Sequence, residues 1–178
     1  MGKKSIRENK NIYQIYREKE ELTREKASER MPGISADRIE KIESGKSQPH
    51  PDEILMMAKG YRVPELCNQY CARECPIGQQ YVPEVPIRDL SQITLEVLNS
   101  LNRLNREKNR LIEITVDGQI TEDEFVDYLR IQHQLDQITQ SVNSLRLWVD
   151  QTIVRGDIDQ VKLEAARKKY TEELKNRE

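Results

Sequence analysis

The stretch from Leu22 to Lys46 constrains the fold most, because it encodes two short helices joined by a tight turn. Thr23 is a good N-cap for a helix over residues 24–31, where small and apolar side chains share one face. Pro32 and Gly33 end that helix, because proline cannot continue it and glycine adopts the left-handed conformation of a sharp turn. The segment therefore predicts a helix, a turn and a second helix in close succession.

The second helix of this segment is predicted over residues 36–43, with Ser35 as its N-cap and Ser44-Gly45 as its end. Its inward side chains are expected to be Ile34, Ile39 and Ile42. The side chains between them point outward in this pattern. These outward residues are Ala36, Asp37, Arg38, Glu40 and Lys41.

This order of helix, turn, capped helix and glycine resembles the phage-repressor-like helix-turn-helix family, often called the XRE family, over about residues 12–66. The resemblance is carried by the Leu22-Thr23 entry, the Ile34-Ser35 cap, the I-x-x-I-E-S-G-K exit over 39–46 and the P-x-x-x-x-I-L-x-M-A-K pattern over 49–59. It implies five short helices on one small core, with the second motif helix entering the major groove of DNA. The turn at Pro32-Gly33 is one residue longer than the usual family pattern.

The resemblance also implies which residues contact DNA. The implied contacts are Arg24 and Lys46 at the backbone, and Ser35, Ala36, Asp37, Arg38 and Lys41 toward the groove. A bidentate contact from Arg38 to guanine is worth about 1–3 kcal/mol of discrimination. Asp37 and Glu40 place two carboxylates on the same face, where phosphate repels them. The alternative is therefore a helix-turn-helix head that binds protein instead of DNA.

Composition favours amphipathic helices over a thick enzyme core, because 34% of residues are charged and 5% are aromatic. Residues 1–62 carry a net charge of +3 and residues 63–178 of −5. A positive end joined to an acidic end is typical of a nucleic-acid-binding head on a protein-binding tail. No apolar run spans a bilayer, so a cytoplasmic protein with no membrane partner is expected.

Four segments are predicted. Residues 1–10 form a basic arm, residues 11–66 the DNA-binding domain, residues 67–88 a connector with cysteines and prolines, and residues 89–178 a helical dimerisation domain. In the domain over 11–66, a first helix and a helix over 52–59 are expected to turn apolar side chains inward. These side chains are Ile12, Ile15 and Tyr16 in the first, and Ile54, Leu55 and Ala58 in the second.

The last segment predicts long helices, because its apolar residues recur at spacings of three, four and seven. In the first long helix they are Leu90, Ile93, Val97, Leu101, Leu104, Leu111 and Ile114. A coiled-coil seam follows over Tyr128, Ile131, Leu135, Ile138, Val142, Leu145 and Val149. Thr121 and Glu124 form a predicted capping box before this seam. The fold class is therefore all-α.

A third helix, from Ile158 to about Lys175, has a thinner apolar stripe of Ile158, Val161, Ala165 and Leu174. The three stripes are expected to bury one another in a helical hairpin or three-helix, coiled-coil-like arm. What remains exposed favours a homodimer through residues 89–178, since operator-binding heads gain affinity from a second half-site. The alternative is a monomeric three-helix bundle.

Three cysteines at C-x3-C-x3-C spacing give a candidate metal site of Cys67, Cys71, Cys75 and His50, for zinc or iron. This spacing is neither a zinc knuckle nor a ferredoxin pattern, and three buried thiols are the alternative. No other cofactor is expected. With a metal bound, the protein would be a metal- or redox-responsive regulator.

No enzyme motif is found: the chain lacks a P-loop, G-x-G-x-x-G, G-x-S-x-G and H-E-x-x-H. The sequence therefore predicts a transcriptional regulator rather than an enzyme, with double-stranded DNA as its partner.

Overall fold

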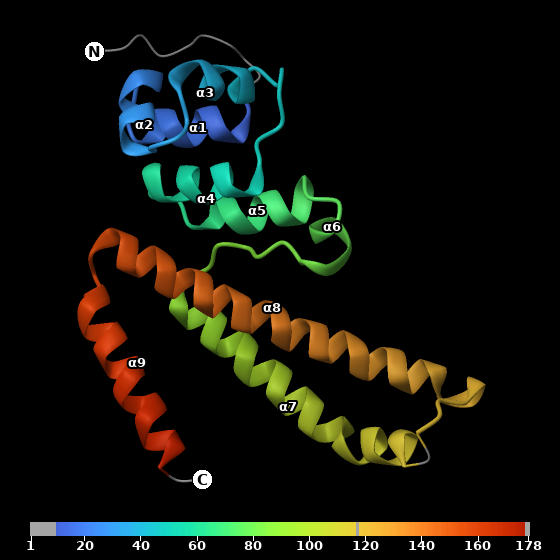
Figure 1. The fold of residues 1–178 in the computed structure, drawn as a ribbon. Coiled ribbons are helices and arrows are strands. Elements are labelled where there is room, and N and C mark those ends of the chain that lie inside the picture. Colours follow the sequence, from blue (N-terminus) through green and yellow to red (C-terminus); the bar gives the residue numbers. More distant parts are fainter. Residues whose placement is uncertain (1–9, 117, 177–178) are drawn as a thin grey trace. The chain divides into compact units, whose positions relative to one another are not determined.

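The computed structural model describes residues 10–116 and 118–176, and every regular element among them is helical (Figure 1). The elements are α1 (Ile12–Lys19), α2 (Arg24–Arg30), α3 (Ala36–Glu43), α4 (Pro51–Gly60), α5 (Glu65–Arg73), α6 (Gly78–Tyr81), α7 (Leu90–Thr115), the 3-10 turn η1 (Glu122–Glu124), α8 (Phe125–Arg155) and α9 (Gln160–Lys175). The predicted all-α fold is confirmed. The basic arm lies outside the described residues, apart from Lys10.

The chain divides into two compact units. The first comprises Met1–Glu84 together with Gln151–Glu178, and the second comprises Val85–Asp150. The first unit extends through α5 and α6, which occupy much of the segment expected to be a connector. Non-helical chain with the predicted extended character begins only after Tyr81.

Helices α1 to α5 enclose one hydrophobic core, as the resemblance implied. The core side chains are Tyr13, Leu22, Ala27, Met31, Ile34, Ile39, Ile42, Ile54, Met57, Ala58, Tyr61, Val63 and Leu66. Both predicted caps are present: Thr23 Oγ1 accepts the Lys26 amide at 3.3 Å, and Ser35 Oγ accepts the Arg38 amide at 3.1 Å. Side-chain caps therefore define the starts of α2 and α3.

Two expected core residues, Ile15 and Leu55, are exposed instead. In α1 the inward stripe contains Tyr13 and Arg17, because the Tyr13 hydroxyl donates to Glu74 at 2.7 Å and Arg17 pairs with Glu43. In α4 the core position is taken by Met57. Polar partners inside the unit thus decide which side of α1 faces inward.

Helices α5 and α6 pack closely through Gly78. A Cβ atom there would lie 2.0 Å from the Cys71 carbonyl oxygen, so only glycine permits this approach. Arg73 ties the two ends of the segment together, because its guanidinium donates to Glu84, with Nε at 2.9 Å from Oε2.

The second unit is an antiparallel pair of long helices, α7 and the part of α8 up to Asp150 (Figure 1). The predicted capping box of Thr121 and Glu124 is present. In it the Thr121 amide donates to the Glu124 carboxylate at 3.1 Å. Arg110 Nε contacts Asp127 Oδ2 at 2.7 Å, and Arg103 contacts Gln137 at 3.4 Å. The earlier residue of α7, Arg103, pairs with the later residue of α8, Gln137, as expected for antiparallel helices. The two contacts define which residues of α7 and α8 lie opposite each other.

The predicted seam of α8 is only partly buried. Leu135, Val142 and Leu145 are exposed, while the buried positions include the polar residues Gln134, Ser141 and Ser144. The reason is a rotation of α8 that turns its small and polar side chains toward α7.

The expectation that α9 buries an apolar stripe is wrong. No residue of α9 is buried, and Val161 is 77% exposed. Its charged residues surround too few apolar positions to form a packing face. A bundle of three mutually buried helices is therefore absent from the described part of the chain.

Candidate nucleic-acid interface

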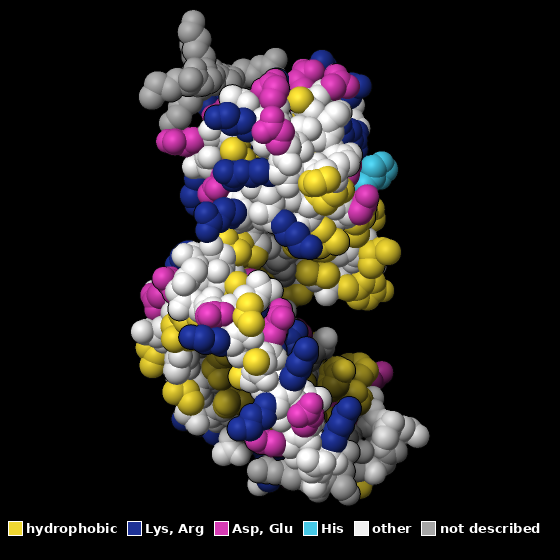
Figure 2. Space-filling view, turned by 60° about the vertical axis from the view of Figure 1, so that its left-hand side comes forward, with side chains coloured by type: hydrophobic (Ala, Val, Ile, Leu, Met, Phe, Trp, Pro, Cys, Tyr) yellow, Lys and Arg dark blue, Asp and Glu magenta, His cyan; other side chains and the backbone are white. Residues whose placement is uncertain are grey.

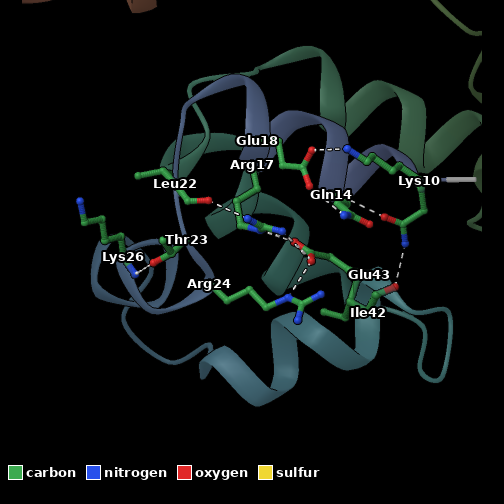
Figure 3. Close-up of polar contacts among 11 residues, drawn as sticks. Lys10, Gln14, Arg17, Glu18, Leu22, Thr23, Arg24, Lys26, Ile42 and Glu43 are labelled. Carbon is green, nitrogen blue, oxygen red and sulfur yellow. Dashed lines mark hydrogen bonds and ion pairs between the residues drawn. The ribbon is translucent and has the colours of Figure 1, made fainter. Parts of the chain in front are cut away.

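A buried carboxylate, that of Glu43, holds the helix-turn-helix together (Figure 3). Glu43 Oε1 lies 2.5 Å from Arg17 Nε, and Oε2 lies 2.9 Å from both Arg17 Nη2 and Arg24 Nε. The Glu43 side chain has no exposed surface. One residue at the end of α3 thus joins α1 and the first residue of α2.

The charge of Arg17 is maintained by this carboxylate. Burial acts to lower the pKa of Arg17, but the hydrogen bonds and charge of Glu43 outweigh burial and raise it. Arg17 Nη1 also donates to the Leu22 carbonyl at 2.6 Å, at the entry to α2. Arg17 was not predicted from the sequence, because the expected inward stripe of α1 was Ile12, Ile15 and Tyr16 and included neither Tyr13 nor Arg17.

The outer face of α3 is exposed and its charges are paired locally. Lys41 Nζ lies 2.7 Å from Asp37 Oδ2, and Lys46 Nζ lies 3.5 Å from Glu40 Oε1. The side chains of Lys41 and Lys46 retain 50% and 67% exposure. The hydrogen bond from Lys41 lowers the pKa of Asp37. Asp37 and Glu40, whose negative charge would repel phosphate, thus each pair with a lysine.

Arg38, expected to contact guanine, faces α4 instead. Its Nε and Nη2 donate to the two Glu53 oxygens at 2.7 Å each, Nη2 also donates to the Gln48 carbonyl at 2.8 Å, and Nη1 donates to Ser47. Glu53 in turn accepts the His50 amide at 2.7 Å. The hydrogen bond from Arg38 is the main cause that lowers the pKa of Glu53. Arg38 therefore braces the loop between α3 and α4.

The other candidate contact residues lie at the starts of α2 and α3. Arg24 is partly exposed beside Glu43, Ser35 is exposed at the start of α3, and Ala36 is partly buried in its first turn. Figure 2 shows lysine and arginine side chains among aspartate and glutamate side chains on one face of the first unit. The surface is mixed in charge and lacks a broad basic patch in this view.

The candidate metal ligands do not assemble. Among the residues that the structure describes, which include all four candidates, no group of three or more His, Cys, Asp or Glu side chains is placed to hold a metal ion. The three cysteines are partly buried thiols on and after α5, and His50 is exposed at the start of α4. Burial, followed by the nearby Cys75, raises the pKa of the Cys71 thiol.

No protein-family model, curated protein or solved structure matches the chain. Within the described residues, no helix combines the length and the apolar character needed to cross a bilayer. A functional proposal therefore depends on the geometry of the chain's own residues.

Proposed function

We propose that the chain is a transcriptional regulator that binds double-stranded DNA through α3 and acts as a homodimer through residues 89–178. The observation that supports this most is the exposed outer face of a short, capped α3. Its inner side chains Ile39 and Ile42 are fully buried, and Glu43 fixes it against α1 and α2. A rigid helix with an uncovered polar face is what insertion into a major groove needs.

The roles proposed for the individual residues follow from their positions. Ser35, Ala36, Asp37 and Lys41 approach base edges, and Arg24 and Lys46 approach phosphates. Lys41 and Lys46 are exposed enough to exchange their carboxylate partners for DNA. Arg38 positions the loop over residues 44–50 and contributes to binding through that loop.

A second candidate function is a protein-interaction module built on the same head. It is favoured by the local charge pairing on α3, where Asp37 and Glu40 offset Lys41 and Lys46. Such a face has little net charge to attract a polyanion. The two functions differ in their response to salt, since binding to DNA releases counterions.

The test is fluorescence anisotropy of a labelled duplex of mixed sequence with the full chain, at several salt concentrations. We expect binding that weakens linearly on a log–log plot against salt. Lys46→Ala is expected to weaken binding and to reduce the slope of that plot by about one, because it removes one phosphate contact that displaces a counterion. Lys41→Ala removes a contact to base edges and is expected to weaken binding with a smaller change in slope.

The matched control is Lys168→Ala, which removes an equal charge from the exposed surface of α9. It should leave both affinity and slope unchanged. Equal losses in all three variants would show a non-specific charge effect, and salt-independent or absent binding would favour the protein-interaction module.

A further inference from the structure

A polar cleft, called here the hairpin cleft, lies between α7 and α8 within the second unit. Its volume is about 270 Å³, close to the lower end of the range of about 300–1,000 Å³ that is usual for small-molecule pockets. Such pockets usually combine an apolar lining with a few polar groups. Every side chain that lines the hairpin cleft carries a charge, an amide or a hydroxyl. Its chemistry therefore suits a small molecule that forms hydrogen bonds along its whole length.

One wall of the hairpin cleft comes from α7. Four lining residues share one face of this helix, because the later three follow the first by three, four and seven positions. These residues are Glu96, Asn99, Ser100 and Arg103. The wall is about 10 Å long, at a rise of about 1.5 Å per residue. Arg88, just before the N-cap of α7, forms an ion pair with Glu96 at one end of this wall.

The other wall comes from α8, through Gln137, Gln140 and Ser141. Arg103 Nη1 lies 3.4 Å from Gln137 Oε1, so these two residues are level with each other. Ser100 lies three residues back along α7 from this contact, and Ser141 lies four residues forward along α8. Because the helices are antiparallel, the two serines are also level, about one turn from the arginine. A small molecule in the cleft can therefore contact the arginine and both serines together.

Arg103 supplies the positive charge of the hairpin cleft. The ion pairs of the hairpin involve Arg88, Arg110 and Arg130, and Arg103 has no carboxylate partner among the described residues. Its contact with Gln137 is longer than the usual N–H···O bond of about 2.7–3.2 Å. The other two charges that line the cleft neutralise each other in the ion pair described above. A guanidinium binds a carboxylate or a phosphate through two parallel hydrogen bonds, so the cleft selects for an anionic group.

Buried hydroxyls supply the neutral part of the hairpin cleft. Ser100 is 5% exposed, and its side chain forms no hydrogen bond with another described residue. Ser141 is 4% exposed and donates to the Gln137 carbonyl at 2.9 Å, so its oxygen can still accept a hydrogen bond. On the same helix, Gln134 Oε1 and Ser144 Oγ are buried without a partner among the described residues. Buried polar atoms lower stability when they are left unbonded, which favours an occupant that both donates and accepts hydrogen bonds.

We propose that the hairpin cleft binds a small hydroxyl-bearing molecule with one carboxylate or phosphate group. The anionic group contacts the Arg103 guanidinium, and the hydroxyls lie between Ser100 and Ser141. The bound molecule joins α7 to α8, because its partners come from both helices. The site goes beyond the function proposed above and does not depend on whether α3 binds DNA.

Binding is tested by titrating the ¹⁵N-labelled full chain, without DNA, with glycerol 3-phosphate and separately with glycerate, up to millimolar concentration. Glycerol, which lacks the anionic group, and inorganic phosphate, which lacks the hydroxyls, are the matched compounds. We expect at least one anionic probe to shift amides over residues 96–103 and 137–141 saturably, and about tenfold more tightly than either matched compound. Saturation by both probes would show that the site accepts either anionic group, and saturation by one would identify it. No saturable shift at these residues with either probe would overturn the proposal.

Two variants separate ligand binding from a structural role. Arg103→Gln is expected to raise the dissociation constant of the bound probe about tenfold or more, because it removes charge-assisted hydrogen bonds. Ser100→Ala is expected to raise it about threefold, while the melting temperature stays the same or rises, because alanine favours a helix more than serine does.

The matched control is Arg146→Gln. Arg146 is exposed on α8, nine residues from Gln137 and so about 180° around the helix from it. The control should leave the dissociation constant unchanged. An unchanged constant in both Arg103→Gln and Ser100→Ala, or an equal loss in Arg146→Gln, would overturn the proposal.

Discussion

Glu43 is the side chain on which the arrangement of α1, α2 and α3 depends. Its carboxylate is fully buried and receives hydrogen bonds from Arg17 and Arg24. Removing one member of a buried charged cluster leaves the others without compensation, which costs more than the net contribution of the intact cluster. The cluster therefore fixes the position of α3, and substitution of any of its three side chains is expected to lower the stability of the first unit.

We predict that Glu43→Gln lowers the free energy of unfolding of the first unit by about 3–5 kcal/mol, because Arg17 would keep its charge in a buried site. Native-state hydrogen exchange of the amides in α1 to α3 measures this change. Glu29→Gln, at an exposed position of α2, is the control and should change stability by less than about 0.5 kcal/mol. A loss below 1 kcal/mol for Glu43→Gln would show that the cluster is not needed for the fold.

Sequence patterns predicted where the helices lie better than which side of each helix packs against the rest of the chain. The caps at Thr23, Ser35 and Thr121 were predictable, because a cap depends on residues three positions away. The orientation of α1 and α8 was not, because it depends on contacts distant in sequence, such as Tyr13 with Glu74. Apolar periodicity identifies a stripe but does not show whether the same chain or another copy covers it.

The candidate site was also predictable only in part. The pattern identified α3 and its exposed face, but Arg38 could serve equally as a base contact or as a brace in the sequence alone. Its partner Glu53 lies in the next helix, beyond the reach of a local motif. The spacing of the cysteines likewise could not predict whether His50 lies close enough to them to share a metal ion.

The Arg38–Glu53 link between α3 and α4 gives a prediction for acid conditions. Because the hydrogen bond from Arg38 lowers the pKa of Glu53, the folded state holds the charged form more strongly than the unfolded chain does. This stabilisation is fully present above the unfolded pKa, about 4.3, and is lost as pH falls through the lower folded pKa.

We therefore expect Glu53→Gln to destabilise the first unit at pH 7 and to have progressively less effect as pH drops below about 4. Thermal denaturation of the wild type and the variant across pH 3–7 measures the difference, with Glu29→Gln as the control. A difference in stability that stays constant over the whole range would show that the Glu53 charge does not support the link.

For the whole molecule, the proposed function combines two surfaces with different chemistry. The face of α3 is polar with exposed lysines, and the α7–α8 hairpin exposes apolar side chains such as Leu101 and Val142. A dimer carries two copies of α3, so binding of the second to an adjacent half-site becomes intramolecular and strengthens the whole. Loss of the hairpin face should therefore weaken DNA binding without altering the DNA contacts of each head.

The most direct measurement of the central claim is a titration of the ¹⁵N-labelled full chain with a duplex at low salt, followed by amide chemical shifts. The account predicts that the perturbed amides cluster between Ser35 and Lys46 and near Arg24, and that the changes reverse when salt is added. Shifts confined to α6 or α9, or no shifts at any duplex concentration, would contradict it.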